Sequence, residues 1–371
     1  MNGLAPDPGP QRAGPAAGRR AIRVMIVDDS LVARTVLSRI VEAEPDCEIV
    51  AKATTGEMAI ARLAETPVDV ILLDLEMPGM GGIGALPKIL EMAEGGQVLV
   101  VSSLTAEGAE HTLSALSMGA ADTLLKPRAG EFGTDYAQAL VAKIRALARR
   151  PRAAEEPLRR PPSPATRASR SSPREEPLAL AIGASTGGIH ALCLLLGALP
   201  KSFDLPILVV QHLPESFMET LARQLSGAAG RPAVVAGAGT PIERGRIHVA
   251  PGQGHMIVRR EGPLLVTGVS HHAVPSGCVP SVDPLFESLA DAVGARALGV
   301  VLSGMGRDGA IGAARLVQAG GILFAQDAAS SAVWGMPRAV AEAGLATAVL
   351  PPEQIAARLA AIPSQIRAVS A

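Results

Sequence analysis

Short apolar runs alternate with longer segments of helical periodicity between residues 21 and 148. The runs that we expect to form strands cover residues 22–27, 48–51, 68–73, 97–101 and 123–125, and the helical segments after them cover 31–43, 57–64, 83–93, 109–118 and 136–148. Five strand–helix units with short connections predict a parallel, doubly wound sheet. In such a sheet, functional side chains gather at the carboxyl ends of the strands.

A second alternating pattern begins at Leu178 and continues through the C-terminal half. Apolar strands are expected from Leu178 into a glycine-rich turn, and at residues 206–212, 298–302 and 322–325, with helical segments between them. Residues 255–259 and 263–267 have the pattern of a β-hairpin. We therefore predict a second doubly wound, mainly parallel α/β domain that carries one hairpin.

Two polar segments divide the chain into domains. Residues 149–177 hold seven Pro and eight Arg and no aromatic residue, which predicts an extended linker. Residues 1–20 are expected to form a disordered arm, so the predicted domains cover residues 21–148 and 178–371. The net charge is −1, and because both polar segments are basic, the remaining residues are acidic when taken together. An acidic body argues against broad binding of nucleic acid.

Composition excludes several other classes of protein. The three cysteines lie far apart and form no CxxC pair, so neither a zinc ribbon nor a disulfide framework is predicted. The longest apolar run, residues 191–199, is about half the ~18 residues that span a bilayer. The first residues do not have the pattern of a signal peptide. We expect a cytoplasmic protein without membrane insertion, acting as a monomer.

Acidic, hydroxyl and basic residues follow the predicted strands of the first body. Asp28 and Asp29 follow the first strand, Asp74 the third, Ser102 the fourth and Lys126 the fifth. Carboxylates crowded at one edge repel one another unless a cation joins them, and their oxygens suit Mg²⁺. Lys126 is placed to neutralise a phosphoryl oxygen. The simpler alternative is that Asp28 and Asp29 only cap the first helix.

A glycine-rich turn joins the first strand and the first helix of the second body. It reads GASTGG over residues 183–188. This spacing places the hydroxyl of Ser185 at a helix N-terminus, where N–H groups stabilise developing negative charge. Two alternatives remain open: the turn cradles an anion, or its glycines serve packing alone. The dinucleotide spacing and the P-loop lysine are absent.

A serine nucleophile needs a base and an acid that orients the base. Among the seven histidines, His212 is the one that ends a predicted buried strand, whereas His190 is expected to pack or to meet solvent. Asp308 and Asp327 both follow strands, and the residues alone do not rank them. Asp283 begins a helix and is a ready N-cap.

The first body resembles the receiver domain of response regulators over essentially all of residues 21–148. The resemblance implies that Asp74 accepts a phosphoryl group from a histidine kinase. It also implies that Asp28 and Asp29 hold Mg²⁺ together with Asp74, and that Ser102 and Lys126 contact the phosphoryl oxygens.

The second body resembles the catalytic domain of chemotaxis protein-glutamate methylesterases (CheB-type). The matching stretches are IGASTGG, VVQHLPESF, PSVDPLFESL, VLSGMGRDGA and SAVWGMPRAV, within residues 178–345. The resemblance implies Ser185 as nucleophile, His212 as base and Asp308 as the orienting acid. It further implies that the Met305 backbone N–H helps to form the oxyanion hole and that Thr186 lines the site.

Two positions depart from these families. Receivers usually carry an aromatic switch residue three positions before the lysine, and here Thr123 occupies that position. Methylesterases often carry a basic residue or histidine shortly before the PSVD stretch, and here Cys278 and Val279 precede Pro280. An aromatic relay in the receiver is therefore not expected, and Cys278 is expected to be a small loop residue.

Together the two resemblances imply a phosphorylation-activated enzyme that hydrolyses glutamate methyl esters on methyl-accepting chemotaxis receptors and deamidates receptor glutamines. Its partners would be these receptors and a chemotaxis histidine kinase, with Mg²⁺ at the receiver and no cofactor for the esterase. The receiver is expected to cover the serine until it is phosphorylated. The main alternative is a receiver-controlled binding module for an anionic ligand or partner. A DNA-binding regulator is disfavoured by the acidic charge of the folded residues taken together and by the absence of a terminal helix-turn-helix pattern.

Overall fold

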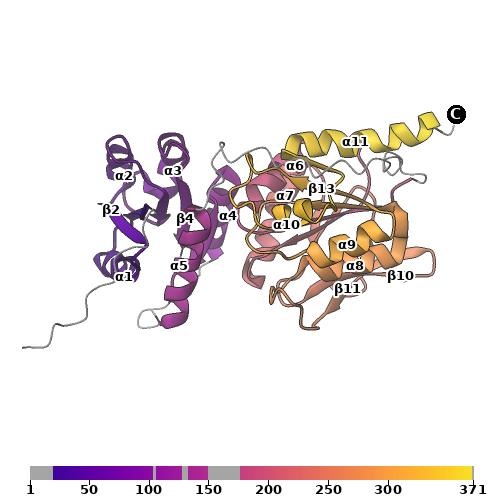
Figure 1. Cartoon of the computed structure of the whole chain (residues 1–371), viewed down its shortest axis with the longest axis horizontal. Helices are drawn as coiled ribbons and strands as arrows, with labels where there is room; N and C mark the ends of the chain where they lie inside the picture. Colours follow the sequence, from indigo (N-terminus) through magenta and orange to yellow (C-terminus); the bar gives the residue numbers. More distant parts are fainter. Residues whose placement is uncertain (1–19, 103–105, 128–132, 149–175, 370–371) are drawn as a thin grey trace, which may run out of the picture.

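The computed structural model describes residues 20–102, 106–127, 133–148 and 176–369, which form two α/β bodies side by side (Figure 1). Apart from Arg20, the predicted arm at residues 1–20 lies outside the described residues, as does the predicted linker 149–177 apart from its last two residues. Within the described residues, no helix is long and apolar enough to cross a membrane.

The first body contains a five-stranded parallel sheet in the order β2-β1-β3-β4-β5. Its strands are β1 (Ile22–Val27), β2 (Cys47–Ala53), β3 (Val70–Leu73), β4 (Gln97–Ser102) and β5 (Asp122–Leu125). Its helices are α1 (Leu31–Glu42), α2 (Gly56–Leu63), α3 (Gly81–Met92), α4 (Ala106–Met118) and α5 (Thr134–Ala148). The predicted parallel, doubly wound sheet is confirmed.

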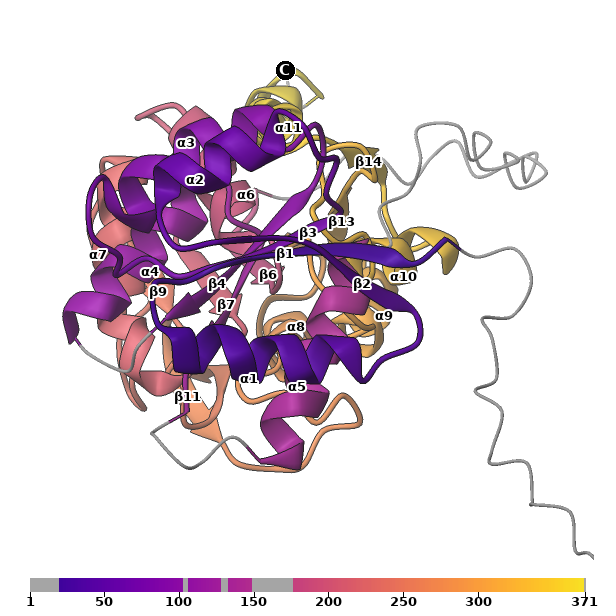
Figure 2. The same ribbon diagram turned by 90° about the vertical axis from the view of Figure 1, so that its left-hand side faces the viewer.

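Alternate residues of each central strand face opposite layers of helices. Val24 and Ile26 of β1 pack in the cluster that contains α1 and α5, whereas Met25 and Val27 pack in the cluster that contains α2, α3 and α4. Figure 2 shows these two layers above and below the sheet. Burial on both faces explains why the strands are almost continuously apolar.

The second body contains a seven-stranded parallel sheet in the order β14-β13-β12-β6-β7-β9-β8. Its strands are β6 (Ala179–Ala184), β7 (Ile207–Gln211), β8 (Ala233–Val235), β9 (Ile247–Val249), β12 (Ala297–Val301), β13 (Ile322–Gln326) and β14 (Ala348–Leu350). The chain leaves β6 toward β7 on one side and later returns to β12 on the other. The sheet therefore has a topological switch point at β6, where sites form in doubly wound folds.

Helices cover both faces of the second sheet (Figure 1). One layer holds α6 (Gly188–Ala198), α7 (Met218–Ala229) and α11 (Pro352–Val369), and the other holds α8 (Val282–Val293), α9 (Ala310–Gln318) and α10 (Met336–Glu342). The predicted hairpin is present as β10 (His255–Glu261) and β11 (Leu264–Ser270), paired antiparallel. The mainly parallel α/β fold with one hairpin is thus confirmed.

The two bodies meet through α4 and the start of β5 on one side and α6 and α7 on the other. Leu113 and Leu116 of α4 belong to the same buried cluster as Ile189 of α6 and Leu221 of α7. Helix α4 of the receiver-like body therefore lies against α6, the helix that follows the glycine-rich turn (Figure 1).

Candidate active site

Ser185 stands on the turn between β6 and α6, and its side chain is partly exposed. The Ser185 N–H donates to the Ser303 carbonyl over 3.0 Å, which extends the sheet onto the turn. Gly187 has φ +74°, and a Cβ there would lie 2.6 Å from the hydroxyl of Ser303. Both the left-handed backbone and the close packing require glycine at this position.

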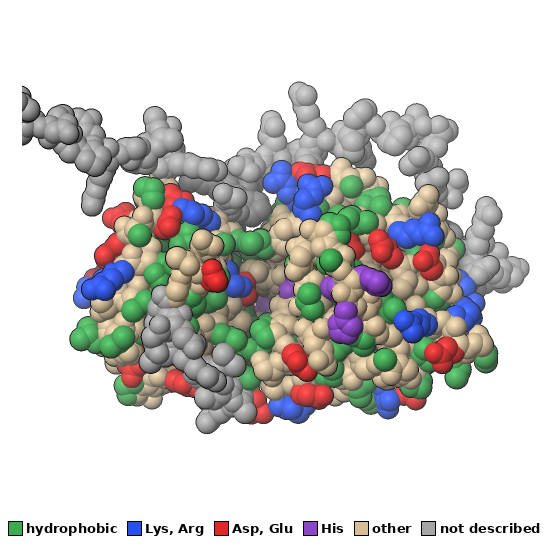
Figure 3. All heavy atoms as spheres, turned by 90° about the horizontal axis from the view of Figure 1, so that it is seen from below, with side chains coloured by type: hydrophobic (Ala, Val, Ile, Leu, Met, Phe, Trp, Pro, Cys, Tyr) green, Lys and Arg blue, Asp and Glu red, His purple; other side chains and the backbone are tan. Residues whose placement is uncertain are grey.

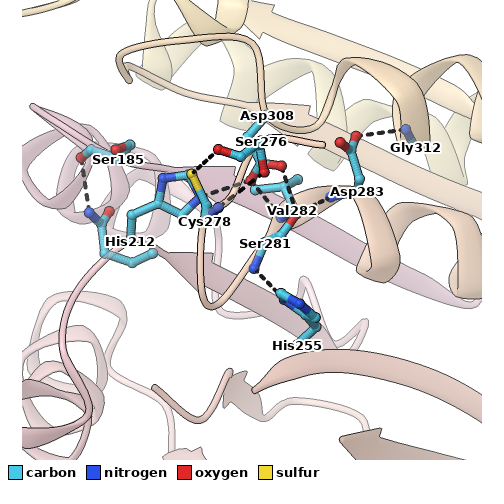
Figure 4. A network of polar contacts seen from close by, with 11 residues as sticks. Ser185, His212, His255, Ser276, Cys278, Ser281, Val282, Asp283, Asp308 and Gly312 are labelled. Atoms are coloured by element: carbon cyan, nitrogen blue, oxygen red, sulfur yellow. Dashed lines mark hydrogen bonds and ion pairs between the residues drawn. The ribbon is translucent and has the colours of Figure 1, made fainter. Parts of the chain in front are cut away.

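His212 follows β7 directly, on the strand next to β6. Its N–H donates to the Ala184 carbonyl over 3.1 Å, and the Gln211 side-chain amide donates to the Ser185 carbonyl over 2.9 Å. These bonds hold the two strand ends in register, so Ser185 and His212 lie side by side at one rim (Figure 4). No hydrogen bond joins their side chains among the described residues, an arrangement common before substrate binds.

Asp308 follows β12, the strand on the other side of β6, and it is buried. Its Oδ2 lies 2.8 Å from Nε2 of His212 and accepts the Val282 N–H over 2.8 Å. Its Oδ1 accepts the Ser281 hydroxyl over 2.6 Å. A carboxylate with three donors keeps the imidazole in a fixed orientation.

Asp327, the other candidate acid, lies elsewhere. It follows β13, one strand further from β6, and its Oδ1 accepts both the N–H and the hydroxyl of Ser330. Asp327 therefore forms hydrogen bonds within the loop after β13, whereas Asp308 is the carboxylate that contacts His212.

Ser281 and His255 support Asp308 from behind, a role that their positions in the sequence did not indicate. The Ser281 N–H donates to Nδ1 of His255 over 3.0 Å, and Nε2 of His255 lies 2.9 Å from the His272 carbonyl (Figure 4). Both Ser281 and His255 are buried. The hydroxyl of Ser281 before a helix was a usable signal, because serine favours that position.

The assignment of Asp283 as the N-cap of its helix is wrong. Ser281 caps α8, and its hydroxyl accepts the Asp283 N–H over 3.3 Å. The Asp283 carboxylate instead accepts the Gly312 N–H of α9 over 2.8 Å. Burial, with the nearby negative charge of Asp308 adding to it, raises the pKa of Asp283 to about 6.

Burial and pairing set the charges of His212 and Asp308. Burial alone would raise the pKa of Asp308, but its hydrogen bonds to His212, Ser281 and Val282 outweigh burial and lower the pKa to about 2. Burial alone would lower the pKa of His212, but Asp308 and then Cys278 raise it to about 9. Asp308 is therefore ionised at neutral pH and favours the imidazolium form of His212.

The loop between β12 and α9 passes directly over Ser185. A Cβ on Gly304 would lie 2.8 Å from the Cβ of Ser185, so only glycine lets the loop approach this closely. Met305 follows it, and within the part of the chain that the structure describes its N–H has no hydrogen-bond partner. The Met305 N–H is therefore available near the serine as a donor to an anion.

The receiver-like body has its own polar cluster at the carboxyl ends of its strands. Nζ of Lys126 lies 2.6 Å from Oδ2 of Asp74 and 2.9 Å from Oδ2 of Asp28, and both carboxylates are buried. Asp29 is exposed, yet one oxygen from each of the three aspartates lies within 4.8 Å of the others. Burial raises the pKa of Asp74 although Lys126 opposes this effect.

Ser30, not Asp28 or Asp29, caps α1, because its hydroxyl accepts the Ala33 N–H over 3.3 Å. The aspartates are thus left for another role, and an all-oxygen donor set suits Mg²⁺. Ser102 is buried at the same edge, with its hydroxyl 3.4 Å from that of Thr123.

The receiver-like body forms hydrogen bonds with the turn that carries Ser185. The Thr186 hydroxyl donates to Oδ2 of Asp122 over 2.5 Å, and the Gly187 N–H donates to the Ala121 carbonyl over 2.5 Å. Nδ1 of His190 lies 2.8 Å from the Ser117 carbonyl. The expectation that His190 only packs or meets solvent is therefore corrected, because it bonds to the other body. Thr186 does lie beside Ser185, but its hydroxyl is hydrogen-bonded to Asp122 of the receiver-like body.

Comparisons with known proteins agree with the two-body architecture. The family described as CheB methylesterase matches residues 180–359, and the family described as response regulator receiver domain matches residues 24–133. A protein-glutamate methylesterase/protein-glutamine glutaminase 1 of Paramagnetospirillum magneticum is 41% identical over 366 residues, which cover 92% of this chain and 96% of that protein.

A second relative, the protein-glutamate methylesterase/protein-glutamine glutaminase 2 of Caulobacter vibrioides, is 46% identical over 346 residues, with 90% and 96% covered. Among solved structures, the CheB methylesterase catalytic domain of Thermotoga maritima is 32% identical, covers 50% of this chain and 98% of its own, and has a TM-score of 0.49. The identity to full-length relatives over both bodies decides the matter: this chain belongs to the CheB-type family of protein-glutamate methylesterases/protein-glutamine glutaminases, response regulators with a receiver and a methylesterase domain.

Proposed function

We propose that this chain is a phosphorylation-gated, cytoplasmic and monomeric methylesterase in which Ser185, His212 and Asp308 form the catalytic triad. Its substrates would be glutamate methyl esters, and selected glutamines, on methyl-accepting chemotaxis receptors. The observation that carries the proposal is the arrangement around β6: the serine at its end, the histidine at the end of β7 beside it, and the buried acid after β12 bonded to that histidine.

In this mechanism His212 works through Nδ1. Its Nε2 is bonded to Asp308, so Nδ1 is the ring atom left to take the proton of the Ser185 hydroxyl. The serine oxygen attacks the ester carbonyl carbon, the bond to the methoxy group breaks, and the imidazolium returns its proton to release methanol. Water then hydrolyses the acyl-enzyme with His212 again as base. With glutamine as substrate, ammonia leaves instead of methanol.

The Met305 N–H is the proposed donor to the tetrahedral oxyanion. It lies on the loop that crosses Ser185, and one such donor is typically worth about 3 kcal/mol in the transition state. The Ser185 N–H does not serve this role, because it is bonded to the Ser303 carbonyl. Thr186 would line the substrate site once its hydroxyl is released from the receiver.

The receiver would take a phosphoryl group on Asp74 from a chemotaxis histidine kinase. Asp28, Asp29 and Asp74 supply the oxygen ligands that fit Mg²⁺, which when bound would neutralise charge between carboxylate and phosphoryl oxygens. Lys126, which forms an ion pair with Asp74, and the Ser102 hydroxyl would contact the phosphoryl oxygens.

The gate in this proposal is the docking of the receiver on the serine turn. Bonds from Thr186, Gly187 and His190 hold the receiver where a receptor helix would have to approach Ser185. Phosphorylation adds a charge of about −1.5 to −2 at Asp74 and would weaken this docking.

Labelling with a fluorophosphonate probe, together with methanol release from methylated receptor, tests the triad. We expect wild type to be labelled and Ser185→Ala to lose label and turnover, the latter by roughly 10⁴-fold or more. Ser303→Ala is the control, because it removes another serine hydroxyl, a buried one that contacts the same turn. If the probe labels Ser185, this variant should still be labelled. A Ser185→Ala protein that still releases methanol would exclude this nucleophile. A protein that binds receptor without ester cleavage would be a binding module.

A further inference from the structure

Cys278 lies against the catalytic pair, although the esterase mechanism gives it no task. Figure 4 shows its sulfur beside the imidazole of His212. One ligand atom each from Cys278, His212 and Asp308 lies within 4.8 Å of the other two. From this cluster we propose a zinc site made of the Cys278 thiolate, an imidazole nitrogen of His212 and the Asp308 carboxylate, which stops ester hydrolysis when occupied.

The donor set selects zinc over the cations that the receiver binds. Sulfur and imidazole are ligands that Zn²⁺ prefers, whereas Mg²⁺ takes oxygen ligands. The thiolate and the carboxylate carry two negative charges together, so Zn²⁺ leaves the site neutral. This balance matters because Asp308 is buried, and His212 and Cys278 are half-buried.

The distances are close to those that zinc needs. Bonds of about 2.0–2.3 Å in a tetrahedron place ligand atoms about 3.5 Å apart. The present atoms lie within 4.8 Å of one another, so small side-chain movements would complete three corners. The fourth corner would hold water, as in zinc sites with three protein ligands.

The surroundings already orient two of the ligands. The Ser281 hydroxyl bonds Oδ1 of Asp308 and leaves Oδ2 toward His212, as partners behind metal ligands commonly do. The Cys278 N–H donates to the Ser276 hydroxyl over 3.3 Å, which fixes the loop that carries the thiol. Because residues 275–277 and 279 of this loop are exposed, a cation can approach from the loop side.

Inhibition follows from which groups zinc occupies. A bound zinc would coordinate an imidazole nitrogen of His212 and move the ring from its position between Asp308 and Ser185. His212 could then no longer act as the base. This consequence rests on the proposed triad, whereas binding of the metal itself does not. The two parts are therefore measured separately.

Binding is tested by titrating the full-length protein with Co²⁺ in excess Mg²⁺, so that the oxygen site of the receiver is filled. We expect one equivalent of Co²⁺ to give the near-ultraviolet charge-transfer band of a thiolate ligand, and ZnCl₂ to remove it. Cys278→Ser should weaken binding at least about tenfold, the lower end of what loss of even an outer partner costs. Cys193→Ser changes another half-buried thiol and should bind like wild type.

Inhibition is tested by adding ZnCl₂ to the esterase assay, with each variant normalised to its own rate without zinc. Wild type and Cys193→Ser should lose activity at the zinc concentration that fills the site, and Cys278→Ser should need at least about tenfold more.

Exposed histidines provide the competing explanation. Histidine side chains reach the surface on one face of the second body (Figure 3), and His271 and His272 are exposed. The double variant His271→Ala/His272→Ala should keep both the band and the inhibition. The proposal is wrong if this double variant loses them, or if Cys278→Ser binds and responds like wild type. Should the protein lack esterase activity, the Co²⁺ titration still decides the metal site.

Discussion

Replacing Asp122 with alanine should raise the esterase rate of the unphosphorylated protein. Oδ2 of Asp122 accepts the Thr186 hydroxyl across the junction over 2.5 Å and is paired with Nζ of Lys143 over 2.6 Å. Alanine removes the acceptor on the receiver side and leaves the catalytic body unchanged. The docked form is therefore weakened without any change to Ser185, His212 or Asp308.

The size of the effect follows from the bond that is lost. A hydrogen bond to a charged group contributes about 1.5–3 kcal/mol net, since both partners are hydrated when they separate. At about 1.4 kcal/mol per factor of ten, the docking equilibrium should fall roughly 10- to 100-fold. The basal rate should rise by the same factor until most molecules are released, and the rate of the phosphorylated protein sets the upper limit.

The assay is methanol release from methylated receptor by full-length protein without a phosphodonor. Lys143→Ala is the matched control, because it removes the other partner of the same carboxylate and keeps the bond to Thr186. We expect Asp122→Ala to be activated and Lys143→Ala to stay within a few-fold of wild type. Thermal unfolding of both variants checks that the receiver remains folded.

Equal basal rates of Asp122→Ala and wild type, with strong activation of both by phosphorylation, would refute this prediction. In that case the contact between Thr186 and Asp122 would not contribute to the inhibited state. Equal activation of Asp122→Ala and Lys143→Ala would point instead to the ion pair between these two residues, which both variants remove.

Three further predictions concern the charges of the site. Asp308→Asn should lower kcat by about 10⁴-fold, measured as methanol release, because the His212 tautomer is no longer fixed. In wild type, kcat/KM should keep rising with pH toward about 9, since catalysis needs the neutral imidazole and its pKa is raised to about 9; a plateau near pH 7 would contradict this. The pKa of Asp283 is raised to about 6, so the folded state holds the proton more tightly than the unfolded chain. This contribution to stability is present below about pH 4 and lost as pH rises through 6, so by calorimetry Asp283→Asn should raise the unfolding temperature at pH 8 and change it little at pH 4.

The long elements of the fold could be predicted from the sequence because their patterns are strong. Strands buried on both faces, such as β1 and β7, are almost continuous apolar runs, with Arg23 in β1 and Gln211 at the end of β7 as the exceptions. The strands that escaped prediction, β8, β9 and β14, have three residues each, which is too short for a periodic pattern. In β9 the middle residue is a buried histidine, His248, whose Nε2 accepts the Glu243 N–H over 3.2 Å.

Only those residues of the candidate site that directly follow apolar strands could be predicted from the sequence. Ser185 and His212 stand at the ends of apolar runs, so sequence position indicated both. Asp308 and Asp327 looked equivalent because both follow strands, and what separates them is that β12 pairs with β6 whereas β13 does not. His190 was misjudged for a related reason: its partner belongs to another domain, which no local pattern reports.

Strand β5 connects the two regulated sites of the molecule. Asp122 begins the strand and Lys126 follows its last residue, so about 13 Å of extended chain separates the docking contact from the proposed phosphorylation pocket. Thr123 stands where receivers usually carry an aromatic switch residue, and it is buried against Ser102, so we propose that the signal passes along β5 by a shift of the strand itself. Phosphorylation and Asp122→Ala then weaken the same docked state from the two ends of β5. Their effects on the esterase rate should be less than multiplicative, and a phosphodonor should activate Asp122→Ala by a smaller factor than wild type. Equal factors would mean that the phosphoryl signal reaches the serine turn by another path.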